Sequence, residues 1–253
     1  MDTNSNRHLP PVIYVAESPE QTVNYKWCSD SKYLDKGIDV MLPAQIRELG
    51  KKNGLALPYD LKPGQALLRY PNNKGYVAAS EAEEVFVRDV VDCIFHVAQR
   101  LGARRIVYCD CQTSNQKREL STENGLSVKA VKVDANVDKS TEEKLSKIFT
   151  RTTEYVPNPD LSAEDRYSNA LSFARDNGLM GYAEIRELLN ARNPQSGSLA
   201  KSHKIKADLT SSLNKSLNVA VTLNVLPVFH LDSTTKTATE TCTTVNVSWD
   251  VEF

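Results

Sequence analysis

The stretches KSLNVAVTLNV, residues Lys215–Val225, and TTVNVSWDVEF, residues Thr243–Phe253, carry the strongest structural signal in the chain. In both, an apolar residue stands at every second position, the pattern of a β-strand with one face on a core and the other in water. The alternating apolar residues are Leu217, Val219, Val221, Leu223, Val225, Val245, Val247, Trp249, Val251 and Phe253. Both stretches reach the roughly 9 to 11 residues that a membrane-spanning strand needs. The sequence therefore predicts two long amphipathic strands, and these ten residues are the candidate assembly or membrane-inserting positions.

The same period of two continues towards the N-terminus. Residues Ile205–Leu213 and Leu126–Val137 also alternate between apolar and polar, which predicts further half-exposed strands. In the second of these the apolar phase changes between Ala130 and Val131, and such a change predicts a β-bulge. A less regular return strand is predicted for Leu145–Tyr155.

A helix is predicted most clearly over residues 81–101. Ser80 and Glu83 have the spacing of a capping box, and Gly102 stands where a left-handed C-terminal cap belongs. The apolar stripe at spacings of three and four comprises Val87, Val91, Ile94, Ala98 and Leu101.

Three shorter helices are also predicted. One begins at Ser162, with Asp165 three residues on, and a second follows it and ends before Pro194. A third is opened by Pro43 and ended by Gly50 or Gly54.

The first half of the chain reads as mixed secondary structure. Strands are predicted for Val12–Ala16, Gln65–Tyr70 and Ala103–Cys111, whereas the polar stretch Glu17–Lys36 is predicted as loop or edge. The fold class is therefore α+β, a mixed or antiparallel sheet with long amphipathic strands in the C-terminal half and three to four helices packed on it. We expect one domain over 1–253, with lobes at 1–120 (mixed α/β) and 121–253 (β-rich with a helical pair).

Composition narrows the classes of partner. The 31 basic residues nearly cancel the 32 acidic ones, so the chain lacks the net field of a nucleic-acid binder, and nucleic acid is disfavoured as a partner. Neither a cleavable leader in Met1–Pro11 nor an apolar run of about 20 residues is present in the sequence, which predicts a cytoplasmic protein. The five scattered cysteines favour reduced thiols over a disulfide framework.

The residues with reactive or metal-binding side chains form no complete constellation. Cys109 and Cys111 lie two apart in a predicted strand without the second ligand pair of a structural zinc site. His96 lies opposite the apolar stripe of its helix, and His230 has no recognisable spacing to another ligand. The common hydrolase, dinucleotide and phosphate-loop signatures are missing. No catalytic, cofactor-binding or metal-binding residue is assigned, and no cofactor is expected.

The order of strand pair, helical pair and strand pair is similar in coarse plan to soluble pore-forming proteins of the gasdermin and perforin-like type, although no motif matches residue by residue. The leading hypothesis is a non-enzymatic interaction or effector protein whose long amphipathic β-hairpins mediate assembly with a protein partner or further copies of the chain, and insertion into a membrane is the stronger form of that hypothesis. The alternative is an enzyme whose site is assembled from dispersed residues, with Cys109, Cys111, His96 or His230 as contributors.

Overall fold

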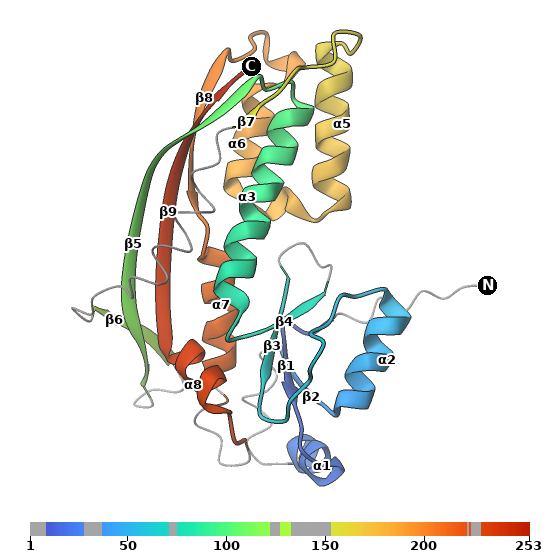
Figure 1. The fold of residues 1–253 in the computed structure, drawn as a ribbon, viewed down its shortest axis with the longest axis vertical. Coiled ribbons are helices and arrows are strands. Elements are labelled where there is room, and N and C mark those ends of the chain that lie inside the picture. The colour runs from blue at the N-terminus through green and yellow to red at the C-terminus, as the bar shows by residue number, and fades with distance from the viewer. Residues whose placement is uncertain are drawn as a thin grey trace.

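A computed structural model describes residues 9–27, 37–70, 75–121, 127–132, 153–221, 223 and 229–253 (Figure 1). The helices in these ranges are α1 (Pro19–Trp27), α2 (Pro43–Asn53), α3 (Ala82–Arg100), α5 (Ala163–Asp176), α6 (Ala183–Ala191), α7 (Ser211–Ala220) and α8 (Ser233–Glu240). The strands are β1 (Val12–Val15), β2 (Ile38–Met41), β3 (Ala66–Arg69), β4 (Tyr76–Ala78), β5 (Arg105–Ser121), β6 (Ser127–Lys132), β7 (Thr153–Glu154), β8 (Ser202–Asp208) and β9 (Thr241–Glu252). The α+β fold class is confirmed.

The strands form two separate sheets (Figure 1). The smaller sheet has the order β2-β1-β3-β4 and is mixed, because β1 pairs with β2 in parallel and with β3 antiparallel. The larger sheet has the order β6-β5-β9-β8, with β7 beside the start of β5, and all its pairings are antiparallel. Its long strands run along one side of the molecule, and α3, α5 and α6 cover one face. The long strands of the C-terminal half therefore belong to one continuous sheet.

The bulge of the large sheet lies at a different place from the predicted one. β5 and β9 pair from Arg105 opposite Glu252 to Lys117 opposite Thr241, and the register shifts between Tyr108 and Asp110. Cys109 is therefore the extra residue of the bulge. The bulge predicted at Ala130 to Val131 is wrong, because β6 pairs with β5 through both residues without a shift.

The central helix α3 confirms the sequence prediction in its length and its buried face. Val87, Val91 and Ile94 are buried, and Gly102 after the helix has the predicted left-handed conformation at φ +88°. The capping box at Ser80 is wrong, because Glu81 is the N-cap residue and makes no side-chain cap. The chain enters α3 directly from a turn after β4, in which Glu81 N donates to Ala78 O, and this turn leaves Ser80 outside the helix.

The strand predicted for Lys215–Val225 is the main correction. Leu217 and Val219 lie in α7, Val221 is its C-cap residue and Leu223 follows in a short 3-10 turn, while Val225 lies outside the described residues. The physical reason is that the same residues also have a helical periodicity. Leu213, Leu217 and Ala220 are spaced by four and three, and the structure buries these three residues on one helical face.

Of the other helices and strands, some confirm the sequence prediction and some were not predicted. The strand predicted for Thr243–Phe253 is confirmed as β9, whose residues Val245, Val247, Trp249 and Val251 are all buried. The helices that open at Ser162 and end before Pro194 are confirmed as α5 and α6. Helices α1 and α8 and strands β2 and β4 were not predicted. Most of the return strand predicted for Leu145–Tyr155 lies outside the described residues.

The buried side chains form three clusters that follow this layout. The largest lies between the long strands and α3, α5 and α6, and includes Trp249, whose ring meets Phe95 edge-on with centroids 6.4 Å apart. The second joins the small sheet to α7 and the start of α3, and the third lies between the small sheet and α2. In the part of the chain that the structure describes, no helix is long and apolar enough to cross a membrane. The domain count remains a prediction.

Candidate functional site

Nine of the ten candidate residues are described by the structure, and they lie in or directly after α7 and β9. Four of the second group, Val245 to Val251 at every second position, are buried in the core beneath β9. Phe253 is half-buried, and the Arg192 guanidinium carbon lies 4.6 Å from the centre of its ring. Of the first group, Leu217, Val221 and Leu223 are buried and Val219 is half-buried. The structure therefore places both groups against a core but does not pair them as a hairpin.

Helix α7 connects the two sheets. It follows β8 directly, and the turn between them is fixed by the Asp208 carboxylate, which accepts from the backbone N–H and the hydroxyl of Thr210 at 3.0 and 2.9 Å. Its buried face, Leu213, Leu217 and Ala220, packs into the cluster that contains Tyr14, Leu68 and Phe86. Tertiary packing of this kind, rather than intrinsic propensity, holds a helix as short as this one.

Helix α8 begins at a well-formed cap. The Asp232 carboxylate accepts from Thr235 N and from the Thr234 hydroxyl, both at 2.7 Å. Burial raises the pKa of Asp232, but these hydrogen bonds to Thr235 and Thr234 outweigh it, so the pKa lies below its ordinary value. The helix therefore depends on a charged carboxylate at its N-terminus.

The segment before α8 is tied to the small sheet. The Tyr14 hydroxyl donates to the His230 carbonyl at 3.1 Å, and Asp232 N donates to Gly64 O at 3.1 Å. Phe229 meets the rings of Tyr14 and Tyr25 edge-on, with centroids 4.8 and 6.0 Å away. We call these contacts of residues 229–232 with Tyr14, Tyr25 and Gly64 the α8 anchor.

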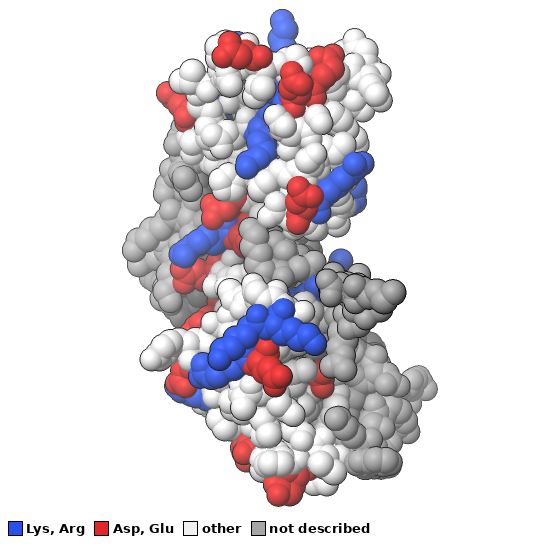
Figure 2. Space-filling model, turned by 90° about the vertical axis from the view of Figure 1, so that its right-hand side faces the viewer, with Lys and Arg blue, Asp and Glu red and all other residues white. Residues whose placement is uncertain are grey.

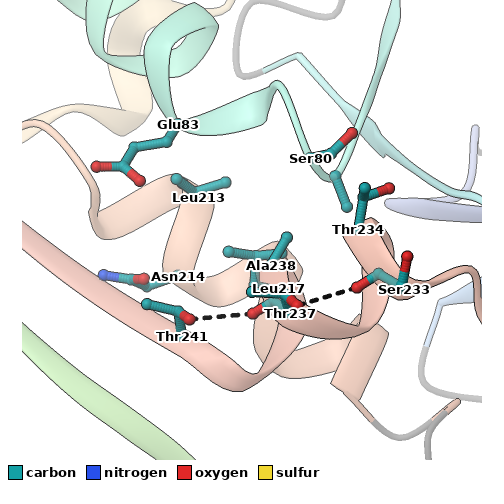
Figure 3. A pocket seen from close by; sticks show the side chains of 11 residues that line it. Ser80, Glu83, Leu213, Asn214, Leu217, Ser233, Thr234, Thr237, Ala238 and Thr241 are labelled. Carbon is teal, nitrogen blue, oxygen red and sulfur yellow. Dashed lines mark hydrogen bonds between the residues drawn. The ribbon is translucent and has the colours of Figure 1, made fainter. Parts of the chain in front are cut away.

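A pocket of about 480 Å³ separates α7 and α8 from the start of α3 (Figure 3). Its polar lining comes from hydroxyls on α8 and from Thr241 at the start of β9, together with Ser80, Glu83 and Asn214. Its apolar lining includes Leu213 and Leu217. Three of the hydroxyls already donate within the chain: Thr234 Oγ1 to the Asp232 carboxylate at 2.7 Å, and Thr237 Oγ1 to Ser233 O and Thr241 Oγ1 to Thr237 O, each at 3.0 Å. We therefore interpret the pocket as a gap in the packing of α7 and α8 against α3. We do not interpret it as a binding site with polar groups directed at a ligand.

The residues of the enzyme alternative are scattered over separate elements. Cys109 is exposed at the bulge of β5, where burial and the neighbouring Asp250 raise the pKa of its thiol, so it is a poor nucleophile at neutral pH. His96 is exposed on α3 with its ring 5.9 Å from that of Phe173, and His230 is exposed in the α8 anchor. Cys111 lies on β5, and its side chain is outside what the structure describes. Among the described residues no three His, Cys, Asp or Glu side chains are grouped to hold a metal ion.

Basic side chains gather in a band across the lower half of one face (Figure 2), the half that carries α2. On α2 the exposed residues Arg47, Lys51 and Lys52 have the acidic Glu48 among them. Lys51 and Lys52 occupy the last turn, where cations stabilise the helix dipole. Helix stability accounts for Lys51 and Lys52, and the band identifies no ligand.

Comparisons with family models, with curated proteins and with solved structures found no match to this chain.

Proposed function

We propose that this chain is a non-enzymatic assembly protein in which residues 209–240 convert from the helical pair α7–α8 into an extension of strands β8 and β9. The product is one long amphipathic β-hairpin that pairs with other copies of the chain. Its apolar face would then contact the hydrocarbon of a membrane. The observation that carries this proposal is the register between β8 and β9.

That register holds as far as Leu209, two residues before α7 begins. The pairing ends at Asp208 opposite Asn246, and Leu209 N still donates to Val245 O at 2.9 Å. Continued at the same register, Leu213 faces Thr241, Leu217 faces Thr237 and Val221 faces Ser233. The two strands then meet at residues 226–228, which contain the only proline of the sequence after Pro194. Proline suits such a turn because it cannot donate to the ladder of a strand.

The same register also sorts the side chains of the first strand, residues 213–223, by polarity. The face that continues the buried face of β9 receives Leu213, Leu217, Val219, Val221 and Leu223 on one strand, with Ser211 and Lys215 as exceptions. On the partner strand the same face receives Phe229 and Leu231, then serine and threonine at every second position from 233 to 243. The other face receives Asn214, Ser216 and Asn218 on that strand, and Asp232, Lys236 and Glu240 on its partner. A register shift of one residue would move the apolar residues of the first strand to the other face, so the agreement on that strand supports the pairing.

Two structural features support the capacity to convert. The edge of β9 over Thr241–Thr244 has no β8 partner in the described residues, because α7 leaves the sheet there. Helix α8, STTKTATE, has threonine at half of its eight positions, and threonine favours strands over helices. The helical pair is therefore held by its packing and by the α8 anchor.

Paired cysteines test the register directly. In a Cys109→Ser background, Ser216→Cys with Ala238→Cys places two thiols opposite each other on the polar face of the extended hairpin, whereas Ser216→Cys with Thr237→Cys places them on opposite faces. We expect oxidation to join the first pair, but not the second, after exposure to anionic liposomes at low pH or after limited proteolysis. Infrared spectra should then show loss of helix and gain of strand.

Two results would contradict the proposal. One is a disulfide that forms equally fast in both double variants. The other is assembly into larger species with an unchanged infrared helix signal.

A further inference from the structure

A second hollow lies at the opposite end of α3 from the pocket of Figure 3. This groove of about 660 Å³ runs between the end of α3, the segment Tyr155–Leu161 and one face of α5. Arg166, Asn169 and Phe173 share that face of α5 at spacings of three and four, and all three line the groove. The groove shares no lining residue with the pocket beside α7 and α8.

Arg100 enters the groove in a fixed orientation. Its guanidinium carbon lies 3.8 Å from the centre of the Phe173 ring, and Nη1 donates to the His96 carbonyl at 3.1 Å. Stacking on an aromatic ring restricts the guanidinium plane and leaves its other N–H groups available as donors.

Arg166 is fixed in a similar way from the other side. Its Nη2 donates to the Asn158 carbonyl at 2.6 Å, and its side chain crosses closely over Gly102. A Cβ at Gly102 would lie 3.1 Å from both Cδ and Nη1 of Arg166. The absence of a side chain at Gly102 therefore creates the space that Arg166 occupies.

Among the residues that the structure describes, the two guanidinium groups lack a partner of opposite charge. In the described ranges neither Arg100 nor Arg166 is within ion-pair distance of a carboxylate, and both are half-buried. The nearby Arg192 adds to the positive charge, and burial together with the charge of Arg166 lowers the pKa of Arg192. The carboxylate that lines the groove, Asp176, is exposed, and water screens its charge.

We infer that this groove binds a phosphate monoester, with the phosphate held between Arg100 and Arg166. A monoester carries about −1.5 to −2 charges near pH 7, which matches two unpaired guanidinium groups better than a single carboxylate does. Asn169 and Ser172 supply neutral donors at the same wall of the groove, and both side chains are exposed. The rest of the ligand lies along the segment Tyr155–Leu161, where Val156 is 97% exposed.

Calorimetric titration with phenyl phosphate and with inorganic phosphate tests the site on the full chain. We expect phenyl phosphate to bind more tightly than inorganic phosphate, because its ring can contact the apolar side chains of the segment Tyr155–Leu161. Arg166→Gln and Arg100→Gln should each weaken binding about tenfold to a hundredfold, the effect of removing a charge-assisted hydrogen bond. Arg175→Gln is the matched control, since Arg175 is exposed on the same helix and does not line the groove, and it should bind as the wild type does.

The natural source of the phosphate is distinguished by a second measurement. Cosedimentation with vesicles that contain phosphatidic acid, lost in Arg166→Gln, assigns the phosphate to a lipid headgroup. Binding of phenyl phosphate without cosedimentation assigns it to a soluble ester. Absence of binding by either probe at millimolar concentration overturns the inference, as does full retention of binding in a folded Arg166→Gln protein. Equal losses of binding affinity in Arg175→Gln and Arg166→Gln overturn it as well, since they show that binding depends on the overall positive charge and not on the groove.

Discussion

Ile94 tests the position of the main core at the scale of one residue. Its side chain is 1% exposed in the middle of α3, so Ile94→Asp buries a carboxyl among apolar neighbours. We expect a loss of several kcal/mol of unfolding free energy, in the tail above about 4 kcal/mol of single substitutions. Urea unfolding measures it, and His96→Asp, two residues along on the exposed face, should cost less than about 1 kcal/mol. Similar losses in the two variants would mean that the buried face of α3 is misplaced.

Gly64 and Gly54 form a natural pair for testing the α8 anchor. Both have left-handed backbones, at φ +84° and +63°, so alanine at either position is strained. A Cβ at Gly64 would also lie 2.7 Å from the His230 carbonyl, whereas a Cβ at Gly54 meets nothing within 4 Å. We expect Gly54→Ala to cost about 1 kcal/mol and Gly64→Ala about 1 to 3 kcal/mol more.

Hydrogen exchange in the same two variants locates the effect. Gly64→Ala should speed the exchange of Thr235 N–H and Lys236 N–H at the start of α8, since both are bonded to Asp232. Gly54→Ala should leave those amides unchanged. Equal exchange in both variants would show that Gly64 does not hold the anchor in place.

Some residues were predictable from the sequence because their signal is local. The left-handed Gly102 and the pair Ser162 and Asp165, in which Asp165 N donates to the Ser162 hydroxyl at 3.1 Å, follow from short-range rules. The same rule failed at Ser80, because the turn after β4 decides where α3 begins. Nothing in the sequence indicated that Arg100 and Arg166 line a groove. A groove between two helices depends on how they pack, and neither helix sequence alone determines that packing.

At the scale of elements, α7 shows how one stretch satisfies two periods. Leu217 and Val221 are both two and four residues from other apolar positions, so the alternation in Lys215–Val225 coexists with a helical stripe. The long run of alternation favoured a strand, while burial of Leu213, Leu217 and Ala220 against the small sheet selects the helix. The competing contacts are distant in sequence, so local periodicity alone did not resolve them.

Acid should weaken the cap of α8. The folded-state pKa of Asp232 lies below its ordinary value of 3.8, so the carboxylate stabilises the folded state above the unfolded pKa, and this contribution is lost as pH falls through the folded pKa. We expect unfolding free energy to fall between about pH 5 and the folded pKa, and Asp232→Asn to flatten part of that slope, because asparagine caps a helix without titrating. Urea unfolding at several pH values measures the difference. Identical slopes in the two proteins would exclude Asp232 as a contributor.

At the scale of the whole molecule, α7 couples two sheets that share no strand. Its preceding strand β8 belongs to the large sheet, while its buried residues Leu213 and Leu217 pack with the small sheet. Conversion of residues 209–240 would therefore separate α7 from the small sheet and extend the large one. The α8 anchor, which includes the bond from the Tyr14 hydroxyl to the His230 carbonyl, opposes this conversion.

The global layout was predictable only in part. Burial at every second residue of β9 follows from its alternation, and so does the α+β class. The division into two sheets was not predictable from the sequence. Strand β1 pairs in parallel with β2, and the polar stretch that connects them contains helix α1, which has no apolar stripe to reveal it. Partner choice among strands depends on contacts between segments that are distant in sequence.

The membrane form of the proposed function predicts an asymmetry between two exposed residues of the resting protein. Thr237 on α8 and Asn218 on α7 are both exposed, so arginine at either position should leave resting stability nearly unchanged. In the extended hairpin Thr237 lies on the apolar face opposite Leu217, and Asn218 lies on the polar face at nearly the same depth. Thr237→Arg would then place a charge in hydrocarbon at a cost of about 2 to 4 kcal/mol at the bilayer midplane, whereas Asn218→Arg would face water.

Dye release from anionic liposomes measures this difference, with low pH and limited proteolysis as triggers. We expect wild type and Asn218→Arg to release dye alike and Thr237→Arg to release severalfold less, while all three retain the same thermal stability before the trigger. Equal release by all three would show that the face bearing Thr237 does not meet lipid, because an arginine on a lipid-facing position near the midplane carries that cost. If wild type releases no dye under either trigger, the membrane form of the proposal fails, and the cysteine pair at Ser216 and Ala238 then decides whether the hairpin extends in protein assemblies alone.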